Sequence, residues 1–112
     1  MSLSIKIKFQ DDFKIIEMEG RILSEADLEP AHKMLNENKN WKLVFDLSKL
    51  QHTNSSGIAF LVKSLTRSRI NGGEVVILKV GEGIKKLFEI TKMDEVFPIV
   101  DSLNEVKSIF KS

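Results

Sequence analysis

The stretch Leu43-Val-Phe-Asp-Leu-Ser-Lys-Leu-Gln-His-Thr-Asn-Ser-Ser-Gly57 decides the fold, because an apolar run in it leads through a short polar loop into a hydroxyl-rich segment. The apolar run, Leu43 to Leu47, is typical of a strand buried on both faces in the middle of a parallel sheet. Five small or polar residues precede the next apolar periodicity: Thr53, Asn54, Ser55, Ser56 and Gly57. We expect them at the C-terminal edge of the sheet, where ligands and modifying enzymes usually reach α/β folds.

An amphipathic helix is predicted to begin near Ser55 and to end at the segment Asn71-Gly72-Gly73. Its expected core-facing stripe consists of four apolar residues: Ile58, Leu61, Val62 and Leu65. Three further residues are expected on a different face of this helix: Phe60, Lys63 and Arg67. Gly72-Gly73 and Gly81-Glu82-Gly83 match no phosphate-binding motif, and they are interpreted as a helix stop and as a turn into the next helix.

The remaining elements alternate between strand and helix patterns. Strands are predicted at residues 3–9, 13–19, 41–47, 74–78 and 96–100, and Pro98 favours an edge position for the last one. Further helices are predicted after the N-cap Ser24, with Pro30 delaying or kinking the start, at residues 82–90, and at the C-terminal end, where Asp101 is the predicted cap. The order ββαβαβαβα predicts a single α/β domain over residues 1–112. Its sheet is mixed and four- to five-stranded, an N-terminal antiparallel hairpin followed by parallel strands, with about four helices.

Composition narrows the class of protein. Seventeen basic and sixteen acidic residues give a net charge of +1, which argues against a direct nucleic-acid binder. The chain has no Cys, so disulfides and thiolate chemistry are excluded, and a cytoplasmic protein is expected. The N-terminus does not have the pattern of a signal peptide, and the apolar runs are too short to span a bilayer. His32 and His52, the two histidines, lack metal-ligand spacing, so no metal and no cofactor are expected.

The hydroxyl-rich segment has two interpretations. Asn and Ser are preferred N-caps, and a cap needs only one of them, so simple capping is one interpretation. A serine protease is not supported, because there is no GxSxG elbow and no histidine that can be argued as the base. No catalytic residue is therefore assigned, and an enzyme such as a nucleotide hydrolase is not expected. The second interpretation is a serine that another enzyme modifies.

Three segments together resemble the STAS domain, and most closely the bacterial anti-sigma factor antagonists. They are Val44-Phe-Asp-Leu-Ser-Lys-Leu-Gln-His-Thr-Asn-Ser-Ser-Gly-Ile-Ala59, Gly72-Gly73-Glu74 and Ile84-Lys-Lys-Leu-Phe88. The resemblance extends from the N-terminal hairpin to the last helix. It implies a four- to five-stranded sheet flanked by helices, in agreement with the pattern described above.

The resemblance also implies a function. Such an antagonist binds an anti-sigma factor that is itself a serine kinase, and it is switched off when that kinase phosphorylates a serine at a helix N-terminus; a serine phosphatase reverses the modification. By position the acceptor is Ser55, Asn54 stands where many members have Asp, and Ser56 and Gly57 complete the motif.

Further expectations follow from this assignment. Contacts with the partner are expected from Phe60, Lys63 and Arg67, in a monomer or weak dimer. The alternative is a non-phosphorylated STAS scaffold or accessory subunit of a signalling or transport complex, in which the same motif serves mostly as a helix cap.

Overall fold

The computed structural model describes residues 3–111 and contains one five-stranded sheet in which the strands lie in chain order. β1 and β2 pair antiparallel, and every later pair is parallel, as the sequence predicts. The strands are β1 (Leu3–Gln10), β2 (Phe13–Arg21), β3 (Lys42–His52), β4 (Glu74–Leu78) and β5 (Ile99–Val100). The bounds predicted for β4 are confirmed, and β5, the strand interrupted by Pro98, lies at the edge.

Four α-helices and two short 3₁₀ turns connect the strands. They are η1 (Glu25–Leu28), α1 (Glu29–Glu37), α2 (Ser55–Ile70), α3 (Glu82–Ile90), η2 (Met93–Glu95) and α4 (Leu103–Lys111). Pro30 lies in the first turn of α1, where its missing N–H removes no helical hydrogen bond, and η1 forms the delayed start that the sequence suggests. Among the described residues, no helix is both long and apolar enough to cross a membrane.

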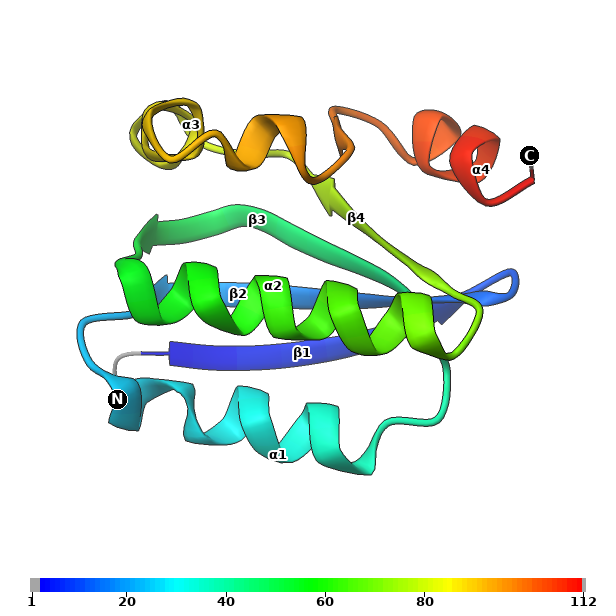
Figure 1. Ribbon diagram of the computed structural model, residues 1–112, viewed down its shortest axis with the longest axis horizontal. Helices are drawn as coiled ribbons and strands as arrows, with labels where there is room; N and C mark the ends of the chain where they lie inside the picture. Colours follow the sequence, from blue (N-terminus) through cyan, green and yellow to red (C-terminus); the bar gives the residue numbers. More distant parts are fainter. Residues whose placement is uncertain (1–2, 112) are drawn as a thin grey trace.

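The two faces of the sheet carry cores of different size, and α2 lies in front of the strands in Figure 1. We call the larger one, under α1, α2 and α3, the major core; its largest buried side chains include Ile16, Phe45, Phe60, Ile77 and Phe88. The smaller one, which we call the minor core, lies under α4 and consists of Phe13, Ile15, Val44, Val76, Leu78 and Val106. Neighbouring strand residues therefore alternate between the two cores, since successive side chains of a strand point to opposite faces.

β3 extends five residues beyond the predicted end of the strand at Leu47. The extra residues pair only with the end of β2, because β4 already ends opposite Asp46. Of them Leu50 is buried, whereas Ser48 and Lys49 are exposed. Because this segment has a neighbouring strand on one side only and exposed side chains, its residues are mostly polar. Its composition therefore suggests a loop, although its backbone forms a strand.

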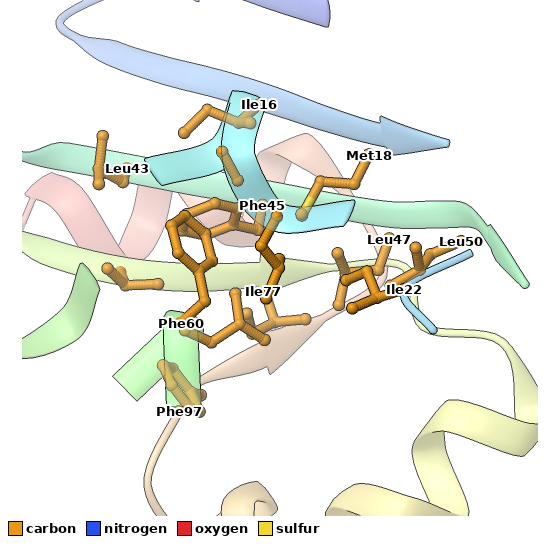
Figure 2. Close-up of a cluster of buried hydrophobic side chains, with 14 of the residues drawn as sticks. Ile16, Met18, Ile22, Leu43, Phe45, Leu47, Leu50, Phe60, Ile77 and Phe97 are labelled. Carbon is orange, nitrogen blue, oxygen red and sulfur yellow. The ribbon is translucent and has the colours of Figure 1, made fainter. Parts of the chain in front are cut away.

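The face that α2 turns toward the sheet agrees only in part with the prediction: Leu61 and Leu65 are buried as expected, but the stripe is rotated relative to the predicted one. Phe60 is 1% exposed and packs edge-on against Phe45, with 5.9 Å between the ring centroids (Figure 2). Val62, which was predicted to face the core, is 36% exposed. The buried stripe includes Ser64 and Ser68, both without exposed surface. The Ser64 hydroxyl donates to the Phe60 carbonyl at 2.9 Å, which satisfies a polar group inside the core.

The ends of the fold also differ in detail from the sequence prediction. β1 forms where expected, but of its alternating apolar residues only Leu3 is buried, while Ile7 and Phe9 are exposed. The cap of α4 is Ser102 rather than the predicted Asp101: the Ser102 hydroxyl accepts from the Glu105 amide at 3.3 Å. The Glu105 carboxylate in turn accepts from the Asp101 amide at 3.0 Å, which is a reciprocal cap one residue later than predicted.

Candidate functional site

The hydroxyl-rich segment lies at the C-terminal edge of the sheet, as the sequence predicts. β2 and β3 run parallel and end together, with Arg21 opposite His52. The Ile22 amide then donates to the His52 carbonyl at 2.9 Å, which holds the chain after β2 against the end of β3. Only two residues, Thr53 and Asn54, separate β3 from α2. The start of α2 is thereby fixed to the sheet at both neighbouring strands.

Asn54 caps α2. Its backbone is extended, and its side-chain oxygen Oδ1 accepts from the Gly57 amide at 3.2 Å. The Asn54 carbonyl accepts the first helical bond, from the Ile58 amide at 3.1 Å. The question that the sequence left open, which residue of Asn54-Ser55-Ser56 serves as the cap, is answered in favour of Asn54.

Ser55 is the first residue of the 16-residue helix α2 and is exposed. Within the part of the chain that the structure describes, its hydroxyl has no hydrogen-bond partner, and Ser56 is half-buried. The first amides of a helix have no intrahelical acceptor, so Ser55 and Ser56 present free N–H groups at the positive end of the helix dipole. The first turn carries no acidic residue that would compete for these groups.

Gly57 allows the close approach of α2 to the preceding strand. A Cβ atom at this position would lie 2.0 Å from the Thr53 hydroxyl oxygen and 3.2 Å from the Ile22 side chain. Because no real Cβ contact is that short, any larger residue would force either the Thr53 side chain to turn or α2 to move from the sheet edge. Thr53 is 7% exposed, so it supports the loop from beneath rather than presenting its hydroxyl at the surface.

The three residues that were predicted to contact the partner differ in how much of each side chain is exposed. The prediction that Phe60 lies off the core stripe is wrong: it is buried in the major core and leaves no surface for a partner to contact. Lys63 is exposed. Arg67 is half-buried, and its guanidinium donates to the Asn36 side-chain oxygen at 3.0 Å, so this residue links α2 to α1.

Other polar groups that the sequence singled out have structural partners. His32 lies 2.9 Å from the Glu25 carboxylate and packs edge-on against Phe60, with 5.2 Å between the rings. No group of three or more His, Cys, Asp or Glu side chains suited to a metal ion occurs in residues 3–111. Sequence reasoning did not find the role of Ile22 against Gly57; the sole signal for it was the glycine itself.

The comparisons with known proteins agree with this geometry. Residues 4–106 match the family model of the STAS domain. An anti-sigma factor antagonist from Mycobacterium paratuberculosis has a TM-score of 0.82 at 18% identity, over 99% of this chain and 96% of that chain. The antagonist SpoIIAA in its unphosphorylated form has a TM-score of 0.78 at 11% identity, over 97% of this chain and 98% of that chain.

The phosphorylated form of SpoIIAA from Bacillus has a TM-score of 0.67 at 9% identity, over 95% of this chain and 99% of that chain. At such identities these structures establish a shared fold. The family match, by contrast, covers nearly the whole chain. The protein therefore belongs to the STAS domain family.

Proposed function

We propose that this protein is an anti-sigma factor antagonist that binds an anti-sigma factor with serine kinase activity and is switched off by phosphorylation of Ser55. The observation that carries the proposal is the division of labour at the start of α2. Asn54 makes the cap, so the exposed Ser55 hydroxyl is not needed to hold the helix. A kinase can therefore modify Ser55 without breaking a hydrogen bond of the fold.

A phosphoryl group at this position suits the protein itself. It adds a charge of about −1.5 to −2 at neutral pH. The helix dipole and the free amides of Ser55 and Ser56 stabilise negative charge at this end of α2. We expect phosphorylated and unmodified protein to unfold at nearly the same denaturant concentration. A partner that packs closely over Ser55 would instead have to bury the new charge.

The effect on binding follows from that difference. A loss of about 3 kcal/mol of binding free energy weakens a complex more than about a hundredfold. Lys63, exposed on α2 about two turns from the acceptor, is a candidate contact, and Arg67 presents part of its side chain one turn farther along the helix. In this proposal a phosphatase restores binding, and all components act in the cytoplasm. The existence of SpoIIAA structures in unphosphorylated and phosphorylated forms supports such a cycle on this fold.

The test begins with the intact mass and a peptide map of the protein from its native host, before and after phosphatase treatment. One removable phosphoryl group on Ser55 is the expected result. Binding to candidate anti-sigma factors from the same host is then measured for the wild type, Ser55→Ala, Ser55→Glu and the neighbouring control Ser56→Ala. Ser55→Glu should lose binding, whereas Ser55→Ala and Ser56→Ala should retain it.

The opposite results are equally informative. A phosphate on Ser56 or Thr53 would move the acceptor and contradict the assignment to Ser55. No phosphate under several growth conditions, together with full binding by Ser55→Glu, would replace the switch with a constitutive scaffold. In that case Asn54-Ser55 would serve only as the start of a helix.

A further inference from the structure

A second candidate binding surface lies at the β1 edge of the sheet, opposite the edge formed by β5. β1 is an edge strand of eight residues, so one side of its backbone carries N–H and C=O groups without a neighbouring strand. On the face of the sheet that carries the major core, Ile7 is 42% exposed and Phe9 is 71% exposed. α1 runs beside β1 (Figure 1). Its cover does not extend over these two side chains, as their exposure shows.

A groove runs between this edge and α1. Ile5, Ile7 and Met34 form its apolar part. Lys33 and Glu37 of α1 line it as well, and Lys14 of β2 reaches it from the neighbouring strand. An unpaired backbone edge beside an apolar groove is the arrangement that binds extended peptides by strand addition.

Lys14 supplies a chemical preference to this groove. Its side chain is buried, with 7% of the residue exposed. The Nζ atom donates to the Asn38 side-chain oxygen at 2.8 Å and lies 5.8 Å from the centre of the Phe9 ring. None of the ion pairs within residues 3–111 includes Lys14, and burial lowers the pKa of its amine. A buried ammonium with neutral acceptors alone favours an acidic group in the groove.

The opposite face of β1 also carries basic side chains. Lys6 and Lys8 point to the opposite face of the sheet, and Lys8 pairs with Glu17 at 2.9 Å. These lysines argue against a second copy of this chain as the occupant. In antiparallel self-pairing centred on Lys6, Ile7 or Lys8, a lysine would stand directly opposite a lysine, which is destabilising. A strand that carries carboxylates has no such conflict.

We propose that β1 and the groove beside α1 bind an extended, acidic segment of another protein by strand addition, with a carboxylate facing Lys14. This surface is separate from the Ser55 site. Lys14 is near the start of β2 and Arg21, opposite His52, is at its end, so the two sites lie roughly 23 Å apart along the strand. The Lys14 end of the groove is therefore distant from the Ser55 site, and β1 itself runs the length of β2, with Leu3 opposite Gly20.

The probe is a capped peptide, Ac-Glu-Glu-Val-Glu-Val-Thr-Val-NH₂, titrated into the isotope-labelled full chain and followed by amide chemical shifts. In antiparallel register its first Glu would face the groove near Lys14 and its later Glu residues would face Lys6 and Lys8. The control peptide carries Lys at every Glu position. The variants are Lys14→Met, Ile7→Glu and the control Ile70→Glu, an exposed apolar residue at the far end of α2.

We expect saturable shifts confined to β1, α1 and the start of β2, with the acidic peptide alone. Lys14→Met should weaken this binding at least about tenfold, Ile7→Glu should abolish it, and Ile70→Glu should leave it unchanged. Three results would overturn the proposal: equal binding of both peptides, shifts elsewhere on the protein, or no saturable shift. Concentration-dependent shifts on β1 without peptide would identify a second copy as the occupant instead.

Discussion

The two faces of the sheet differ in how much of the fold each one supports. Among the described residues the major core holds 20 buried apolar side chains, from β1 to β4, from α1, α2 and α3, and from η1 and two loops. The minor core holds six and is covered by α4 alone. The candidate phosphorylation site stands at the start of α2, over the major core. The candidate phosphorylation site is therefore supported by the more extensively packed core, whereas α4 covers only the smaller one.

The replacement Phe60→Ala tests the major core and should have the largest effect. It removes a ring that contacts both Phe45 and His32 in a fully packed environment. We expect the free energy of unfolding to fall by about 3–5 kcal/mol in a denaturant titration. The exposed neighbour Val62→Ala is the control, with a change below about 0.5 kcal/mol. A cost for Phe60→Ala as small as that of the control would mean that Phe60 is not a core residue.

Val106→Ala tests the minor core. Val106 is the one fully buried residue of α4 within residues 3–111 and closes the cluster with Val44 and Val76. The loss of two methyl groups should cost about 1.5–2.5 kcal/mol. Binding of the partner at the Ser55 site should not change, because α4 packs on the other face. If Val106→Ala destabilised the protein as much as Phe60→Ala, the contrast between the two cores would fail.

Lys14→Met tests the edge of the major core and should have the smallest effect, with a defined pH dependence. Burial lowers the Lys14 pKa below its ordinary value of 10.5, so the folded state disfavours the charged amine. Below the folded-state pKa, Lys14 is protonated in both the folded and the unfolded protein, so the full cost of burying its charge lowers the stability of the wild type. As the pH rises toward 10.5, the folded state releases the proton first and the wild type gains stability.

The variant should therefore be as stable as the wild type or slightly more stable at neutral pH. Its advantage should shrink as the pH is raised toward 10.5 in denaturant titrations. Lys33→Met, an exposed lysine of the same groove, is the control and should show no such trend. An advantage that grew with pH would contradict the direction of the pKa shift.

Much of the fold was predictable, because most elements carry a clear period and clear ends. β4 and α3 begin and end where the sequence predicts, between glycines and polar turns. The second half of β3 was not predictable, since a strand with one neighbour and one covered face has a polar composition. The core face of α2 was predicted only in part: Leu61 and Leu65 are buried as expected, but Val62 is exposed and Phe60 is buried. Ser64 and Ser68 look like surface residues in the sequence, although both are buried and Ser64 donates its hydroxyl within the helix.

The candidate site was predictable in position but not in geometry. The sequence places Ser55 at the start of a helix at the sheet edge, and the structure agrees. It could not decide between Asn54 and a serine as the cap, because all of these residue types cap helices well. It also assigned Phe60 to the surface, since the stripe containing Val62 has the same helical spacing as the true one. Only the packing of α2 on the strands distinguishes the two.

The strand order has a consequence for how the protein is made. Each strand of the sheet lies beside the strand that precedes it in the chain, so no strand has to wait for a distant, later segment before it can pair. Contacts that are near in sequence speed folding, and chains leave the ribosome from the N-terminus. We expect the sheet to grow in the order of synthesis from the β1–β2 hairpin onward. α4 would then be the last element to dock.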